Sequence, residues 1–256
     1  MAWKTGTVAL VFVLLFLAER LMPAAPRPVP PWGRVARNGA LWLLNVGLSV
    51  GLVVPITAFA AGHALAWRPA WWSGAAFAAD VVLLDFLIYW WHRANHEIPF
   101  LWRFHAVHHL DRFLDTTSAV RFHFGEVALS ALARAGVILL IGFPLASVLA
   151  FEAILLVATL FHHSNLRLAP GFERALSRVV ITPSLHWVHH HRKRADTDAT
   201  YGTLFSFWDP LFGTTTATRR TPDMAIGVEG AEETDLIGLL VAPFFAQPTE
   251  RTRRGT

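Results

Sequence analysis

The chain of 256 residues contains no cysteine and little charge. The absence of cysteine excludes a disulfide framework and every metal site built on thiolates. Charged residues make up 16% of the sequence and hydrophobic residues 54%, whereas a soluble domain carries about 25% charged residues. This balance predicts an integral membrane protein. The net charge of +4 then fits arginine-rich cytoplasmic loops and gives no reason to expect nucleic-acid binding.

The sequence also lacks internal repeats, low-complexity tracts and a glycine-rich dinucleotide fingerprint. Residues 1–256 are therefore expected to form a single membrane-embedded domain. Because no nucleotide-, haem- or flavin-binding module is recognisable, a redox activity would take its electrons from a separate carrier.

Histidine, in contrast, is abundant and clustered. The 13 histidines include one HxxxH pair, two HxxHH triplets and one adjacent pair. On a helix, these i,i+3 and i,i+4 spacings put the imidazoles on one face. Imidazole binds iron, zinc, copper or nickel, so the repetition predicts a metal site. The clustered residues are His92, His96, His105, His108, His109, His162, His163, His186, His189 and His190.

Two uncharged stretches near the amino terminus predict membrane spans. Residues 5–18 are interpreted as a first span, although Lys4 and the sequence AAP at 24–26 also fit a secretory signal peptide. Nothing downstream looks exported, which favours the span. Residues 38–67 run for 30 positions without a charge, enough for one tilted crossing at about 20 residues. Pro55 is expected to kink this second span.

A third span is expected over residues 72–91, and it contains Asp80 and Asp85. Carboxylates at membrane depth normally face the interior of a helix bundle. Asp85 shares one helical face with Tyr89 and His92. We expect Asp85 to orient His92 by accepting its free imidazole N–H. The alternative is a buried carboxylate that bonds Tyr89 or a neighbouring helix.

Apolar character resumes over residues 127–161, interrupted by Arg134 and by a turn at 142–144. This pattern predicts a helical hairpin that enters the bilayer and returns. Arg134 either faces the bundle or marks a shallow crossing. Together with the spans within 5–67 and 72–91, the hairpin gives an all-α fold of four to five transmembrane helices.

Arginines set the expected orientation, because positive residues accumulate in cytoplasmic loops. If Arg27, Arg34 and Arg37 are cytoplasmic, the second span runs outward and the third returns to the cytoplasmic side at His92. The hairpin brings the chain back to the same side before the arginine-rich stretch 167–194. All histidine clusters then share one cytosolic face.

Three segments of the C-terminal half are expected to build a cap over that face. Thr182-Pro183-Ser184 is typical of a helix start, and the helix would present the second HxxHH triplet. Residues 204–215 mix aromatic and turn residues and are expected to pack over the site. The apolar run 235–245 is too short to cross a bilayer and is interpreted as an interfacial helix.

Six motifs follow one another along the chain: HRxxH from His92, HxxHH from His105, RxHxxE from Arg121, HHSN from His162, HxxHH from His186 and WDxxFGT from Trp208. In this order they resemble the membrane-bound fatty acid hydroxylase / sterol desaturase superfamily, over residues 80–214. The resemblance implies a di-iron oxygenase with a transmembrane bundle and a cytosolic helical cap. Such an enzyme uses O2 to hydroxylate or desaturate a C–H bond of a lipid.

The resemblance also implies the histidines that hold the two iron ions. Phe124 stands where the family's RxH motif usually has proline. Of the adjacent pair His162 and His163, the second precedes Ser164-Asn165 as the family's single histidine does, and His191 is a rival of His190. The implied ligands are His92, His96, His105, His108, His109, His123, His163, His186, His189 and His190.

Three further expectations concern the surroundings of the site. Asn165 either hydrogen-bonds a ligand or metal-bound water, or caps a helix end. The resemblance implies a lipid substrate and a separate electron donor, such as a cytochrome b5-like protein, a ferredoxin or a reductase. The run Arg192–Lys193–Arg194 either docks an acidic carrier or is an ordinary cytoplasmic basic patch.

Two other classes of function compete with an oxygenase. A zinc-dependent membrane hydrolase is one alternative, because zinc binds imidazole more strongly than ferrous iron does and can also replace iron. A catalytic zinc site, however, uses about three protein ligands. A metal transporter is the other alternative, but its ligands would follow a transmembrane path rather than share one face.

Overall fold

The computed structural model describes residues 2–29, 32–66 and 74–245, and within these ranges helices and isolated β-bridges are the only regular structure. The helices are α1 (Ala2–Leu21), α2 (Trp32–Leu48), η1 (Ser49–Val53), α3 (Val54–Gly62), α4 (Gly74–Glu97), α5 (Pro99–His109), η2 (Ser118–Val120), α6 (Phe124–Ile141), α7 (Leu145–His163), α8 (Pro170–Leu176), α9 (Pro183–His189), α10 (Arg194–Thr197), α11 (Trp208–Phe212), α12 (Leu236–Val241) and η3 (Ala242–Phe244). The predicted all-α fold is confirmed.

Four helices are long and apolar enough to cross a membrane: the continuous helix Trp32–Gly62, then α4, α6 and α7. Large apolar side chains point outward along them, such as Val50, which is 71% exposed, and Leu140, which is 65% exposed. Outward-facing apolar helices are stable in lipid because their backbone groups are satisfied internally. The chain is therefore a multi-pass membrane protein. Residues 67 and 72–73 of the expected second and third spans lie outside the described residues.

A π-helical turn, η1, joins α2 to α3 just before Pro55. A proline lacks the N–H that an α-helix needs and crowds the carbonyl four residues earlier. The wider π turn accommodates both effects. The break in regular α geometry that Pro55 predicts thus takes the form of a π turn.

The helices α6 and α7 form the predicted hairpin. Gly142 ends α6 in the left-handed conformation with φ of 77°, and its N–H bonds the carbonyl of Ile138. Arg134 on α6 forms an ion pair of 3.1 Å with Glu152 on α7. Of the two interpretations of Arg134, the structure supports an inter-helix contact within the hairpin.

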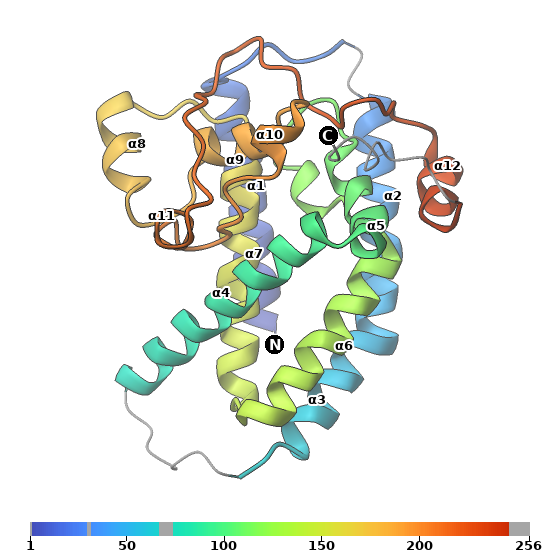
Figure 1. Ribbon diagram of the computed structural model, residues 1–256, viewed down its shortest axis with the longest axis vertical. Coiled ribbons are helices and arrows are strands. Elements are labelled where there is room, and N and C mark those ends of the chain that lie inside the picture. Colours follow the sequence, from blue (N-terminus) through green and yellow to red (C-terminus); the bar gives the residue numbers. More distant parts are fainter. Residues whose placement is uncertain (1, 30–31, 67–73, 246–256) are drawn as a thin grey trace, which may run out of the picture.

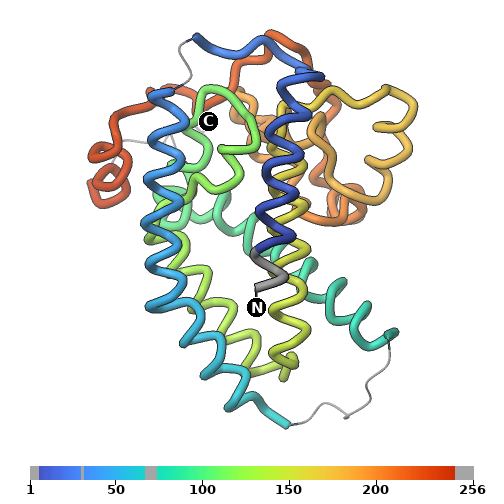
Figure 2. The backbone as a smooth tube through the Cα atoms, turned by 180° about the vertical axis from the view of Figure 1, so that it is seen from behind, coloured from blue at the N-terminus to red at the C-terminus, as the bar shows by residue number. Residues whose placement is uncertain are grey.

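The long helices support a cap at one end. In Figure 1 the short helices α5, α8, α9, α10 and α12 lie toward the upper end of the long helices, and α4 runs obliquely across the front of the bundle. Seen from behind, α1 runs alongside α7 (Figure 2). Glu19, at the end of α1, is fully buried and accepts the backbone N–H groups of Thr116 and Asn165. The apolar run 235–245 forms α12 and η3, which pack against α2 and α5.

Candidate metal centre

Four helices bring the clustered histidines together. The last turns of α4 carry His92 and His96, and α5 carries the first HxxHH triplet. The end of α7 carries His163, and α9, which begins at Pro183 as predicted, carries the second triplet with His190 directly after its last turn. Each helix presents its histidines on one face, and these faces meet under the cap.

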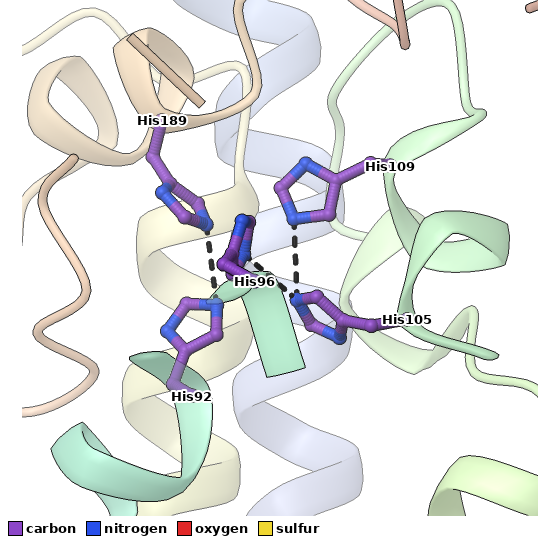
Figure 3. A group of neighbouring side chains, drawn as sticks. All are labelled: His92, His96, His105, His109 and His189. Carbon is purple, nitrogen blue, oxygen red and sulfur yellow. Dashed lines mark hydrogen bonds between the residues drawn. The ribbon is translucent and has the colours of Figure 1, made fainter. Parts of the chain in front are cut away.

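The histidines form two groups. Group one contains His92, His96, His105, His109 and His189 (Figure 3), and group two contains His108, His163, His186 and His190. In each group, one ring nitrogen of every member lies within 4.8 Å of the others, and every member is buried. The two groups are in direct contact, because the ring of His109 in group one stacks on that of His190 in group two with centroids 4.1 Å apart.

Backbone carbonyls fix the tautomer of two rings in group one. The Nδ1–H of His92 donates to the carbonyl of Tyr201 at 2.8 Å, and that of His189 to the carbonyl of Ala199 at 2.7 Å. A neutral imidazole has one N–H, so both Nε2 atoms carry bare lone pairs. These two atoms face each other at 3.2 Å. Two lone pairs at this distance repel, and a cation between them turns the contact into an attraction.

Group two repeats this arrangement. The Nδ1–H of His108 donates to the carbonyl of Arg121 at 3.0 Å, and that of His163 to the carbonyl of Thr159 at 2.9 Å. Their bare Nε2 atoms face each other at 3.0 Å. The geometry therefore suits a cation in each group.

The spacing of the Nε2 atoms fits a first-row metal ion. Imidazole nitrogen lies about 2.1 Å from such an ion, so two nitrogens at right angles are about 3 Å apart. Neighbouring Nε2 atoms are 3.0–3.2 Å apart in both groups. Nitrogen-only donor sets suit iron, zinc, copper or nickel, so the residues present fit an imidazole-bound metal pair.

The electrostatics of the site keep the imidazoles neutral, which is the form that binds a metal. Burial lowers the pKa of the cap histidines well below its ordinary value, and the neighbouring imidazoles lower it further. This applies to His108, His109, His186, His189 and His190.

Glu126 is a functional residue whose role the sequence did not reveal. Its carboxylate accepts the Nδ1–H of His105 at 2.7 Å. A carboxylate partner fixes the ring and makes it a stronger donor to a metal. Glu126 closes the RxHxxE motif, but 21 residues separate it from His105, so only the tertiary structure pairs them.

The structure corrects the expected contact between Asp85 and His92. Asp85 accepts the backbone N–H groups of Leu204 and Phe205 and the indole N–H of Trp208, at 2.8–3.2 Å. The i,i+7 spacing aligns two residues on one face but separates them by about 10 Å along the helix. That separation is too large for a short carboxylate. Asp85 instead anchors the loop whose Tyr201 carbonyl holds His92.

Asp209, in the WDxxFGT motif, anchors the same loop from its other end. Its carboxylate accepts the N–H groups of Tyr201 and Gly202 at 2.7 and 3.1 Å, and the hydroxyl of Thr214 at 2.7 Å. Burial raises the pKa of Asp209 to about 6. Residues 204–215 thus pack against α4 and the loop that carries Tyr201, and through this loop they position one histidine of the site.

Asn165 follows neither of its two interpretations. Its amide exchanges two hydrogen bonds of 2.9 Å with the backbone of Ala25, and its oxygen also accepts from Arg220 at 3.1 Å. Asn165 lies just after α7 and holds the segment that comes after α1. None of these side-chain bonds reaches a histidine or caps a helix.

The expected ligand His123 lies outside both groups. Its Nε2–H donates to the carbonyl of Leu240 at 3.0 Å, and its Nδ1 accepts the N–H of Gly125 at 2.9 Å. Both ring nitrogens are therefore occupied by protein contacts. His191 also lies outside the groups, because its Nδ1 bonds Asp196 at 2.8 Å.

The basic run 192–194 is partly neutralised by acidic neighbours. Arg192 pairs with Glu232 at 2.9 Å, and Arg194 pairs with Asp198 at 2.7 Å. This pairing supports an ordinary basic patch over a docking site for an acidic carrier.

Comparison with known proteins identifies the class. The model of the family "Fatty acid hydroxylase" matches residues 77–214. This match covers more than half of the chain, and the chain belongs to the fatty acid hydroxylase family. It is a membrane oxidoreductase that hydroxylates or oxygenates lipids and has a histidine-rich metal site.

Individual relatives agree with this class. Ornithine lipid hydroxylase OlsE of Rhizobium tropici is 27% identical over 94% of this chain and 76% of its own length. Alkylglycerol monooxygenase of Danio rerio is 31% identical over 59% of this chain, which spans only 32% of that relative. A cholesterol 25-hydroxylase-like protein of Danio rerio is 28% identical over 58% of this chain and 62% of its own length. No solved structure matches the chain significantly.

Proposed function

We propose that each histidine group holds one iron ion and that the protein uses O2 to hydroxylate a C–H bond of a membrane lipid. The observation that carries this proposal is the pair of opposed, bare Nε2 atoms in each group, at 3.2 Å in group one and 3.0 Å in group two. When bound, an iron pair supplies the reduction of O2 and the attack on an unactivated C–H bond.

The residues of this chain supply the environment for that chemistry. Nine neutral imidazoles hold the site without adding negative charge, and the carboxylate of Glu126 gives His105 additional donor strength. Carbonyl contacts fix the orientation of four further rings, those of His92, His108, His163 and His189. Because every one of these histidines is buried, bulk water is kept away from the reacting atoms.

The relatives favour hydroxylation over desaturation. Three of them are named ornithine lipid hydroxylase, alkylglycerol monooxygenase and cholesterol 25-hydroxylase-like protein. OlsE matches this chain over the greatest share of both lengths among these three. We therefore infer a lipid with acyl or alkyl chains as the substrate. The electrons come from a separate protein, such as a cytochrome b5-like protein, a ferredoxin or a reductase.

Purification without oxygen followed by metal analysis tests the proposal. We expect about two iron ions per chain, one for each group, and incorporation of oxygen-18 from labelled O2 into a lipid hydroxyl group. A hydrolase would instead place oxygen from water in its product and would not need O2. That result, with zinc as the functional metal, would replace the proposal. Zinc content without a product assay would not, since zinc can displace iron.

We further propose that the histidine groups face the cytoplasm. The native chain has no cysteine, so single cysteines report position cleanly. Ala195→Cys in α10 should react with a membrane-impermeant maleimide only after cells are opened. Leu65→Cys, at an exposed position near the far end of α3, should react in intact cells. The reverse labelling pattern would invert the orientation.

A further inference from the structure

An apolar groove follows α7 toward group two. Its floor is formed by five residues of α7, and its roof by Val180, Ile181 and Leu204. The floor residues are Ala153, Ile154, Val157, Ala158 and Phe161. The groove encloses about 390 Å³, which lies within the usual range of small-molecule sites, about 300–1,000 Å³. Its outer part is accessible, since Ile154 is 36% exposed. Because α7 is one of the candidate membrane spans, this part faces bilayer hydrocarbon.

Hydrogen bonds hold the two segments of the roof together. The N–H of Ile181 donates to the carbonyl of Leu204 at 3.0 Å, and the N–H of Ser206 donates to the carbonyl of Val179 at 3.0 Å. The N–H of Leu204 also donates to the carboxylate of Asp85 on α4 at 3.2 Å. Two chain segments and a long helix therefore hold the roof at a fixed distance from α7.

A buried polar side chain, His162, lies on α7 just beyond the last lining residue of the groove. Ile154, Ala158 and His162 follow one another at i,i+4 along one face of α7. His162 is fully buried, and its ring lies 4.0 Å from that of His186 in group two, between centroids. By strict hydrogen-bond geometry neither ring nitrogen of His162 has a partner among the described residues, and its nearest polar neighbour is the backbone of Thr203. A buried polar group without a partner is costly and calls for an explanation, such as a bound water, ion or ligand.

Thr203 adds a second unpartnered group at the same place. Its backbone lies against the ring of His162, and it directly precedes Leu204 of the roof. The hydroxyl oxygen of Thr203 is buried and has no hydrogen-bond partner within the part of the chain that the structure describes. Two buried polar groups thus lie just beyond the lining of the apolar groove, and His162 is beside group two.

We propose that this groove binds one acyl or alkyl chain of the lipid substrate, and that His162 and Thr203 hydrogen-bond an oxygen of the lipid beside group two. The proposal rests on the proposed function. The chain of a membrane lipid enters the groove from the bilayer, and its carbonyl or hydroxyl oxygen satisfies the two polar side chains. This places one segment of the lipid next to the metal site.

A second groove serves as the natural comparison. It lies on α4 between Ala78 and Phe86, is closed by Trp208, and encloses about 410 Å³. The rings of Phe86 and Trp208 pack with centroids 5.2 Å apart, and the indole N–H of Trp208 is taken by Asp85. This groove ends in packed aromatic rings with a satisfied donor, and the α7 groove is therefore the one that suits a substrate.

The cysteine-free chain allows a reversible test on folded protein. Ala158→Cys places a thiol in the groove, and Leu156→Cys places one on the same helix at an exposed position outside it. Both variants are purified with metal and then treated with decyl methanethiosulfonate. We expect alkylation at position 158 to lower turnover about tenfold or more, with unchanged metal content, and dithiothreitol to restore it. Alkylation at position 156 should leave turnover unchanged. Full turnover after complete alkylation at position 158 would overturn the proposal.

Photocrosslinking separates lipid binding from catalysis. Palmitic acid with a mid-chain diazirine should label residues 153–161 in the unmodified protein and should no longer do so after alkylation of Ala158→Cys. Labelling of the α4 groove instead would overturn the assignment. Specific labelling of the α7 groove in a protein that oxidises no lipid would contradict the proposed function and leave the groove assignment standing.

Metal content separates His162 from its neighbour. His162→Leu should keep both metals and raise KM about tenfold, whereas His163→Leu should lose metal. Thr203→Val should raise KM in the same direction, also with metal retained. If His162→Leu loses as much metal as His163→Leu, His162 is a metal ligand and its assigned contact with the lipid is wrong.

Discussion

The two histidine groups differ in the number of donors and in what surrounds them. Group one has five imidazoles and group two has four. In group one, the Nδ1–H of His105 donates to the carboxylate of Glu126. In group two, the Nδ1–H groups of His108 and His163 donate to backbone carbonyls. Group one is thus enclosed by its own protein ligands. An ion in group two has fewer protein donors and more room for other ligands. His162, one helical turn beyond Ala158 of the α7 groove, lies beside this group.

The largest expected effect is the removal of a donor. His105→Ala in group one and His186→Ala in group two should both abolish turnover, because the reaction needs both metals. Loss of metal should be more complete in group two, where three donors remain, than in group one, where four remain. Metal analysis of both variants beside the wild type checks this, with membrane insertion as the control for folding. Full activity in either variant would show that the group containing the replaced histidine is not a metal site required for turnover.

Glu126→Gln should have the next largest effect. Glutamine still accepts a hydrogen bond from His105 but lacks the negative charge that strengthens the imidazole. Loss of such a partner typically costs about 10–100-fold in metal affinity or activity. We expect this loss in group one and not in group two, which competition with a metal chelator would resolve as two separate release steps. Glu152→Gln, on the same hairpin but paired with Arg134, is the control and should release both metals as the wild type does.

Asp85→Asn should produce a smaller, indirect effect. The carboxylate accepts three N–H groups, and an amide can replace only part of this acceptor capacity. The loop that carries Tyr201 then loosens, at a cost of about 1–3 kcal/mol for each N–H left unpaired. We expect a lower melting temperature and reduced turnover with both metals still bound. Turnover and stability equal to the wild type would show that Asp85 does not position the loop.

The sequence predicts what local spacing controls. HxxxH and HxxHH specify one helical face, so His92, His96 and both triplets could be placed together without any tertiary information. The contacts that hold these rings depend on the fold. The carbonyls of Tyr201 and Ala199 carry no residue-type signal, because every residue has a carbonyl. Glu126 and His105 meet only when α6 packs against α5.

Two of the expectations that the structure changes, those for Asp85 and His123, rest on sequence spacing alone. Asp85 was placed by its helical face, but a shared face does not imply contact across two turns. His123 was placed by its motif, yet it precedes α6 in an extended conformation and shares no helical face with the other histidines. Spacing therefore predicts a metal-binding histidine well inside a helix or at its end, and poorly in the extended segment before one.

The smallest expected effect on the metal site is that of His123→Asn. Both nitrogens of His123 are used by Gly125 and Leu240, so the ring holds the C-terminal helix α12 against the start of α6. Asparagine can still cap α6 but is too short to keep the second contact. Loss of one such hydrogen bond costs about 0.5–1.5 kcal/mol. We therefore expect a slightly lower melting temperature, both metals bound and most of the turnover retained.

The matched control for this last variant is His163→Asn. His163 lies in group two with its bare Nε2 3.0 Å from that of His108, and its replacement should remove metal and abolish turnover. If His123→Asn loses metal as His163→Asn does, then His123 binds a metal in the loaded enzyme. It would have to break its contact with Leu240 to do so, and group two, with four imidazoles against five, would be the group with room to accept it. Each group would then have five imidazole donors.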